Sequence, residues 1–225
     1  MTLDLVLEPI LRGLCIGALY AVVAMGLSLI FGIMRVINVA HGEFVMLGGY
    51  GIYFAWTALR LDPLVGLVLL FPAAMLFGIV IERVLVEHVV GKPEISSLML
   101  TFGLSVVLWG LAQILFGADF RSIRYLGGAI NILGVHLAAN SVVIFVVSLT
   151  VAGAVFAFLR LASLGQAIRA TSQNQALAQA CGINCRLMRS LGFGMGTALA
   201  ATGGGMVAFA FVVYPQVGLT YIGKS

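Results

Sequence analysis

Charged residues are scarce in this chain. Of its 225 residues only 9% are Asp, Glu, Lys or Arg, whereas 62% are hydrophobic. A soluble globular domain carries about 25% charged residues, so this scarcity excludes a soluble fold. Because about 20 consecutive apolar residues suffice to cross the hydrocarbon core of a bilayer, the composition predicts an all-α membrane protein, a polytopic bundle of transmembrane helices.

Cysteines are few as well, and the N-terminus lacks a basic start. The three cysteines are Cys15, Cys181 and Cys185, and the C-x3-C spacing of the last two matches neither a redox motif nor a usual zinc knuckle. They are predicted to be unligated thiols. Asp4 and Glu8 precede a long apolar run, whereas a cleavable signal has a basic start and a shorter core. The first span is therefore predicted to be retained.

Long apolar runs are abundant and divide the chain into about six spans. They are predicted to form a single transmembrane domain over 1–225, with spans near 13–34, 36–59, 63–81, 95–118, 141–159 and 190–214. The last span is crowded with small residues such as Gly203 and Gly204, so it either packs tightly against neighbours or opens beside a pathway. The connection Glu82–Glu94 carries mixed charges and is predicted to be a solvated loop.

The loop 160–189 sets the predicted orientation. It holds Arg160, Arg169, Arg186 and Arg189 and no acidic residue, and under the positive-inside rule such a loop is cytoplasmic. Counting spans backwards places the N-terminus outside. The less hydrophobic stretch Tyr125–Asn140 then becomes an extracytoplasmic loop that could form a short hairpin. Since the excess positive charge lies in one loop, it does not indicate a nucleic-acid partner.

Polar residues interrupt the second span, which contains Asn38, His41 and Glu43. A charged side chain at the bilayer centre costs about 2.5–3.5 kcal/mol even on a lenient scale, so a functional role is the default hypothesis. The alternative is that these residues lie near the interface, snorkelling or paired with Arg35. On a straight helix His41 and Glu43 face different directions. A break in the helix near Gly42 is therefore predicted to bring the polar groups together at a substrate pathway.

A short helix is predicted inside the arginine-rich loop. Ser172–Cys181 contains several alanines and Leu177, and Gly182 is well placed to end the helix. A short helix at a membrane exit can insert into the groove of a partner protein. It can equally lie on anionic lipid through its arginines, and composition alone leaves both interpretations open.

Two local patterns are misleading. The stretch GLTYIGKS, Gly218–Ser225, matches the phosphate-binding expression G-x4-G-K-S, but a membrane span precedes it where a strand is needed. His41 and Glu43 have no further ligand at a spacing that suits a metal ion. Neither nucleotide nor metal binding is therefore predicted.

Two stretches resemble one known family. GLSLIFGIMRVINVAHGEFVMLGGY, Gly26–Tyr50, and AIRATSQNQALAQACGINCRLMRSLGF, Ala167–Phe193, are similar to the signature and the ATPase-docking segment of branched-chain amino-acid ABC transporter permeases. The core of the first stretch is Asn38 with Ala40–Glu43. Related permeases for amides and urea share much of the pattern. Family members continue beyond Lys224 into further spans, so the chain is expected to be truncated relative to them.

The resemblance implies a subunit of an importer in the bacterial inner membrane, working by alternating access. Its partners would be a second permease subunit, two cytoplasmic ATPases that hydrolyse the ATP, and an extracytoplasmic solute-binding protein, with the lipid bilayer around it and no cofactor in this chain. The substrate pathway is expected near Asn38, His41, Gly42 and Glu43. The residues expected to dock on the ATPase are Arg169, Gln173, Asn174, Ala178, Gly182 and Ile183.

Two rival classes stay open. An ion-coupled secondary transporter or channel would use Glu43 and His41 as an intramembrane proton relay. An intramembrane enzyme would need a nucleophile with a base, or a metal site, within the spans. The spans offer no such set beyond His41 and Glu43, so no enzyme activity is expected.

Overall fold

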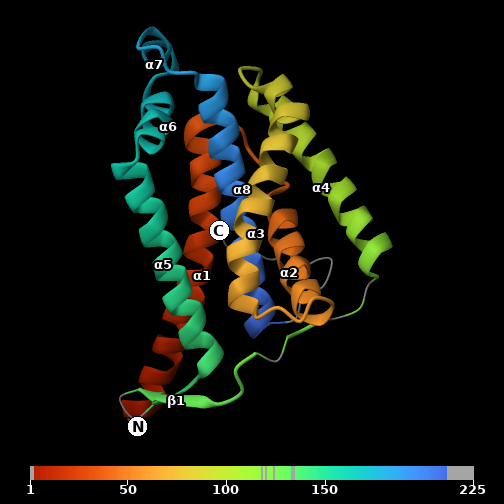
Figure 1. The fold of residues 1–225 in the computed structure, drawn as a ribbon, viewed down its shortest axis with the longest axis vertical. Coiled ribbons are helices and arrows are strands. Elements are labelled where there is room, and N and C mark those ends of the chain that lie inside the picture. The colour runs from red at the N-terminus through yellow and green to blue at the C-terminus, as the bar shows by residue number, and fades with distance from the viewer. Residues whose placement is uncertain (1–2, 118, 120, 124, 133–134, 212–225) are drawn as a thin grey trace.

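The computed structural model describes residues 3–117, 119, 121–123, 125–132 and 135–211, and these form a bundle of helices with one small hairpin (Figure 1). The long helices are α1 (Leu3–Met34), α2 (His41–Thr57), α3 (Pro63–Val84), α4 (Glu94–Phe116), α5 (Ala139–Leu161) and α8 (Cys185–Ala210). The shorter ones are the 3-10 helix η1 (Val86–Val89), α6 (Ser163–Gln173) and α7 (Gln175–Ala180). The predicted all-α class is confirmed.

Five of the described helices are long and apolar enough to cross a membrane, namely α1, α3, α4, α5 and α8. The second predicted span, 36–59, differs, because its helix α2 has only 17 residues. At 1.5 Å per residue α2 is about 25 Å long, somewhat shorter than the hydrocarbon core. The six residues before it, 35–40, are not helical.

The helices run alternately up and down between two ends that differ in character. One end carries α6, α7 and η1, and we call it the coupling end; the other carries the hairpin and the start of α1, and we call it the hairpin end (Figure 1). The hairpin pairs β1 (Ala129–Ile132) with β2 (Val135–Ala138) in antiparallel register. This confirms the short hairpin expected within Tyr125–Asn140.

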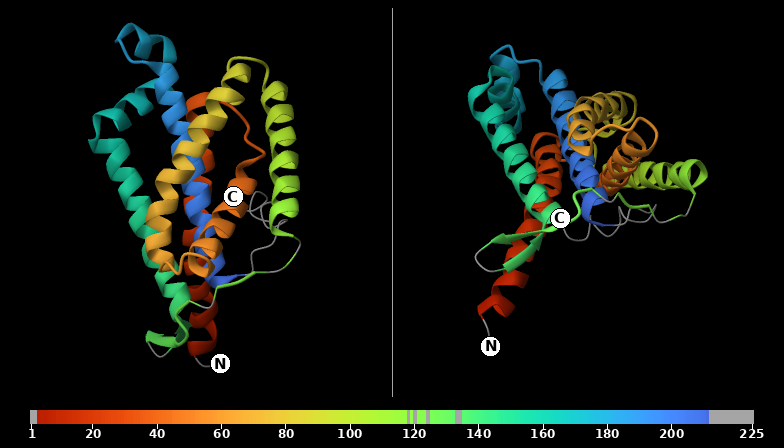
Figure 2. Two further views of the ribbon diagram at one scale, coloured as in Figure 1. Left: turned by 45° about the vertical axis from the view of Figure 1, so that its right-hand side comes forward. Right: turned by 60° about the horizontal axis from the view of Figure 1, so that its bottom comes forward.

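Helix α8 lies at the centre of the bundle, in contact with α1, α2 and α3 (Figures 1 and 2). Its apolar stretch is 94% buried, whereas those of the other four candidate spans are one third buried or less. Small residues make this position possible, because a Cβ atom on Gly204 would overlap the Val45 carbonyl of α2, and one on Gly48 would overlap the Ala201 carbonyl of α8. Of the two interpretations of the glycines, tight packing is the one observed.

The outer helices leave wide apolar faces uncovered. Helix α5 packs mainly on α1, and α4 packs on α2 and η1 (Figure 2). Ile114 of α4 is 82% exposed. Side chains of this kind would be unfavourable in water but suit the hydrocarbon of a bilayer.

Two helices extend beyond the predicted spans. Helix α1 begins at Leu3 and passes through Pro9, ten residues before the predicted start at Gly13. Helix α3 continues to Val84 and takes in Glu82, which is fully buried and not part of a solvated loop. The reason is a partner from α8, since the Ser190 hydroxyl donates to Glu82 Oε2 at 2.5 Å.

The arginine-rich loop is more helical than predicted. It contains α6, which the sequence did not indicate, and α8 already begins at Cys185. The predicted helix Ser172–Cys181 is the shorter α7, because the Asn174 side chain caps its start by accepting from the Leu177 N–H at 3.1 Å. Gly182 follows with φ +82°, a left-handed conformation that favours glycine. The match at Gly218–Ser225 lies outside the described residues.

The central packing predicts that Gly204→Ala destabilises the protein. The added methyl group would force α2 and α8 apart, and overpacking of this kind typically costs about 1–3 kcal/mol. Thermal unfolding of the purified protein in detergent measures the effect. Gly153→Ala in α5 is the matched control, because a Cβ atom there meets open space. A Gly204→Ala variant as stable as Gly153→Ala would contradict the close contact.

Candidate functional site

The second span begins with a break in helical structure. Helix α1 ends at Met34, and Arg35 then adopts a left-handed conformation with φ +51°, which is uncommon for a residue other than glycine. The backbone resumes helix only at His41. Non-helical backbone inside a membrane protein is tolerated where protein buries it and supplies hydrogen-bond partners.

Thr101 of α4 supplies those partners. Its hydroxyl oxygen accepts from the Val39 N–H at 3.2 Å, and it lies 2.9 Å from the Ile37 carbonyl oxygen. The Ser97 carbonyl oxygen of its own helix is also 2.9 Å away, and the single hydroxyl hydrogen can serve only one of these two carbonyls at a time. Thr101 is fully buried, so it joins the break to α4 in the interior.

Thr101 belongs to a polar stripe on α4 that sequence reasoning missed. Ser97, Thr101 and Ser105 are spaced by four residues, share one helix face and are all buried. A signal was available, since three hydroxyl residues at this spacing in an apolar span indicate a helix face turned towards polar partners. It was overlooked because each residue alone is unremarkable in a membrane helix.

Glu43 faces this stripe. The Ser105 hydroxyl donates to Glu43 Oε1 at 3.0 Å, and Glu43 is 2% exposed. Its second carboxylate oxygen has no hydrogen-bond partner among the described residues. A buried carboxyl group with half of its hydrogen-bonding capacity unused is costly, which favours a role beyond packing.

His41 faces the opposite side, towards α1. Its Nε2 lies 3.0 Å from the Val23 carbonyl oxygen, and its Nδ1 is without a partner in the described part of the chain. Gly26 leaves room for the ring, because a Cβ atom there would lie 3.2 Å from His41 Cε1. The glycine of the signature stretch thus has a steric explanation.

The polar groups do not converge as the sequence suggested. The break precedes His41, and Gly42 lies in the first turn of α2, so His41 and Glu43 keep their helical directions and contact different helices. Asn38 lies within the break and is 3% exposed, yet neither polar atom of its side chain has a partner among the described residues. Whether Asn38, His41, Gly42 and Glu43 line a pathway stays a prediction; we call these four the polar cluster.

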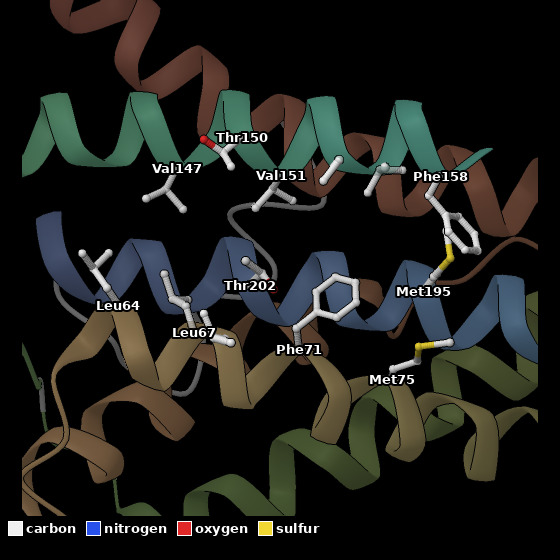
Figure 3. A pocket seen from close by; sticks show the side chains of 13 residues that line it. Leu64, Leu67, Phe71, Met75, Val147, Thr150, Val151, Phe158, Met195 and Thr202 are labelled. Carbon is white, nitrogen blue, oxygen red and sulfur yellow. The ribbon is translucent and has the colours of Figure 1, made fainter. Parts of the chain in front are cut away.

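An apolar groove of about 690 Å³ lies between α3, α5 and α8, and Figure 3 shows side chains of all three helices around it. The hydroxyls of its two threonines, Thr150 and Thr202, both donate to carbonyls of their own helices at 2.8 Å. The groove therefore offers mainly apolar contact, and both of its hydroxyl hydrogens are already used. A smaller cavity of about 310 Å³ between α2, α3 and α8 includes Thr197, whose buried hydroxyl has no partner in the described structure.

The residues predicted to dock on an ATPase differ in accessibility. Four of them are exposed, namely Arg169, Gln173, Asn174 and Gly182. Ala178 is only 4% exposed, and Ile183 is partly buried. Leu177, which the sequence placed in the short helix but not among these six residues, is 65% exposed on α7. The docking role of the six residues stays a prediction.

An ion pair joins the start of α8 to η1. Arg186 donates to Glu87 Oε2 at 2.8 Å, and this guanidinium holds the pKa of Glu87 below its usual value. The pair is therefore ionised at neutral pH. One turn further along α8, the Ser190 hydroxyl donates to the buried Glu82.

These features define a multi-pass membrane protein with a buried polar break in its second span. Comparison with known proteins gives its family. A family model described as a branched-chain amino acid transport system permease component matches residues 10–224. The chain therefore belongs to this family of permease components, which confirms the resemblance of its two signature stretches.

Individual relatives agree with this membership. BraD of Pseudomonas aeruginosa, a high-affinity branched-chain amino acid transport system permease protein, is 29% identical over 94% of this chain and 74% of its own length. LivH of Escherichia coli K12, with the same description, is 27% identical over the same shares. A probable branched-chain amino acid transport permease protein of Methanocaldococcus jannaschii is 28% identical over 96% of this chain and 70% of its own. No solved structure matches significantly.

The contacts of Thr101 predict that Thr101→Val destabilises the protein by about 1–3 kcal/mol, because the partly buried Val39 N–H loses its partner. Unfolding of the purified protein followed by circular dichroism measures the loss. Thr150→Val is the matched control: its exposed hydroxyl bonds only to its own helix, and a surface substitution typically changes stability by less than about 0.5 kcal/mol. Equal stabilities of the two variants would show that the break does not depend on Thr101.

Proposed function

We propose that this permease component is the membrane-spanning subunit of an ABC importer for branched-chain amino acids or related small solutes. It would alternate between outward and inward access, driven by separate ATPase subunits. Family membership supports the transport role, and the observation that carries the coupling to an ATPase is the exposed helix α7 at the coupling end. The names of BraD and LivH support branched-chain amino acids as the substrate class.

The distribution of charge supports a cytoplasmic coupling end. Basic residues there outnumber acidic ones: Arg35, Arg83, Lys92, Arg160, Arg169, Arg186 and Arg189 stand against Glu82, Glu87 and Glu94. The described charges at the hairpin end are more evenly matched. The positive-inside rule assigns the basic end to the cytoplasm, where ATPase subunits would meet α6 and α7.

Leu177 supports protein docking over lipid contact. It protrudes from a six-residue helix that Asn174 caps and Ala178 anchors from the buried side. An exposed leucine on a short, fixed helix suits an apolar groove of a partner. Helix α7 itself carries no basic side chain, since Arg169 lies on α6 and Arg186 on α8. The proposed partners are two cytoplasmic ATPases, a second permease subunit and an extracytoplasmic solute-binding protein.

The polar cluster is the proposed centre of the pathway. It combines a buried carboxylate with an amide and an imidazole that retain unused hydrogen-bonding capacity, which suits a zwitterionic solute better than the apolar groove does. The competing proton relay through Glu43 and His41 has less support, since the two side chains point to α4 and α1 respectively.

The remaining parts of the proposal follow from the transport role. The chain would be a bacterial inner-membrane protein that catalyses no reaction itself, holds no cofactor and binds no nucleic acid. ATP would be hydrolysed entirely by the partner subunits.

Reconstitution of the complete complex in proteoliposomes tests the proposal. We expect leucine, isoleucine or valine, delivered by the binding protein, to stimulate ATP hydrolysis and ATP-dependent uptake. Leu177→Glu should reduce both about tenfold or more, because a carboxylate would be buried in the ATPase groove. Leu177→Met is the matched control that keeps an apolar side chain of similar volume.

If uptake does not require ATP and is abolished by a protonophore, the protein is an ion-coupled secondary transporter and the proposal is wrong. Stimulation by amides or urea alone would change the substrate class. Wild-type coupling in Leu177→Glu would remove α7 as the docking element.

A further inference from the structure

At the end of α1 the Ile33 carbonyl lacks the backbone N–H partner that a continuing helix would provide. In a continuing helix the N–H of residue 37 would bind the Ile33 carbonyl, but the chain departs from helical geometry at Arg35. The Gln175 side chain of α7 takes that place. Its amide Nε2 donates to the Ile33 carbonyl oxygen at 3.3 Å, across 142 residues of sequence.

Gln175 belongs to a well-connected unit formed by α6, α7 and the first turn of α8, which we call the coupling unit. The Cys185 thiol donates to the Gln175 carbonyl at 3.6 Å, and the Thr171 hydroxyl lies 3.8 Å from the Cys185 sulfur. Thr171, Ala178 and Cys185 are all buried. A force on the exposed tip of α7 would therefore move these parts together.

Other contacts also join the coupling unit to the bundle. Arg186 binds Glu87 of η1, Ser190 of the next turn binds Glu82 of α3, and α6 packs against α5 and α1. The Gln175 bond differs from these, because it is made to backbone that borders the break, five residues before the buried Asn38. In the described structure no other group donates to the Ile33 carbonyl, so forming or losing this bond can change the position of the break.

We propose that Gln175 is a positioning residue of the transport cycle, which passes the displacement of the coupling unit to the break and its polar cluster through the Ile33 carbonyl. This inference rests on the proposed function, because it needs an ATPase to move α7. Gln175 touches neither solute nor nucleotide in this role. It sets how much transport each hydrolysis event produces.

The test is the ratio of solute taken up to ATP hydrolysed, measured on the reconstituted complex with leucine. Gln175→Leu and Gln175→Glu remove the N–H donor and should lower this ratio about fivefold, the effect of losing one net hydrogen bond. Gln175→Lys keeps a donor of similar reach and should restore at least half of the ratio. Gln179→Leu, an exposed glutamine on the same helix, should leave it unchanged.

Each outcome separates this inference from the proposed function. A wild-type ratio in Gln175→Leu overturns the positioning role while the importer stands. Loss of the ATPase subunit from the purified Gln175→Leu complex also overturns it, because Gln175 would then belong to the docking surface. A merely structural role would reduce the yield of complex without changing the ratio. Absence of ATP-dependent uptake in the wild-type complex, by contrast, counts against the proposed function.

Discussion

Backbone that leaves helical geometry inside a membrane must find its hydrogen-bond partners within the protein. In this chain the requirement falls on residues 35–40. The buried hydroxyl of Thr101 on α4 meets part of it, and N–H groups of the first turn of α2 bind the Asn38 and Ala40 carbonyls. Because the break ends just before His41, the first turn of α2 presents His41 to α1 and Glu43 to the hydroxyl stripe of α4. Asn38 precedes both in sequence, and its buried side-chain amide has no partner among the described residues.

Helix α8 packs against α2, which carries His41 and Glu43, and it connects the centre of the bundle to the coupling end. Its glycines bring the α2 and α8 backbones into direct contact. Its first residues belong to the coupling unit, and its first two turns bind Glu82 of α3 through Ser190 and Glu87 of η1 through Arg186. One helix thus extends from the docking region to the packed centre of the bundle. Bistable changes in such packed interfaces are a common means of converting small shifts into larger movements.

Sequence alone predicted the class, the approximate spans and the family, because long apolar runs and two specific stretches carry that information. It also identified Asn38, His41 and Glu43, since polar groups inside a span are conspicuous. It misplaced the break, because Arg35 adopts a conformation unusual for its residue type and the stabilising Thr101 lies about sixty residues away in sequence. The burial of Glu82 and the inward direction of Ala178 were missed for a similar reason. Both depend on tertiary partners from α8 and from the coupling unit that local composition does not reveal.

The central claim is that the polar cluster, with the ionisable carboxyl group of Glu43, serves transport. Glu43→Gln tests it most directly, because the amide oxygen can still accept the hydrogen bond from Ser105 while the ionisable group is lost. The measurement is the initial rate of ATP-dependent leucine uptake by the reconstituted complex, with its thermal stability and subunit composition determined in parallel. We predict an intact complex of wild-type stability whose uptake falls about tenfold or more, equivalent to about 1.4 kcal/mol. An intact complex with wild-type uptake would contradict the claim and make Glu43 a structural residue.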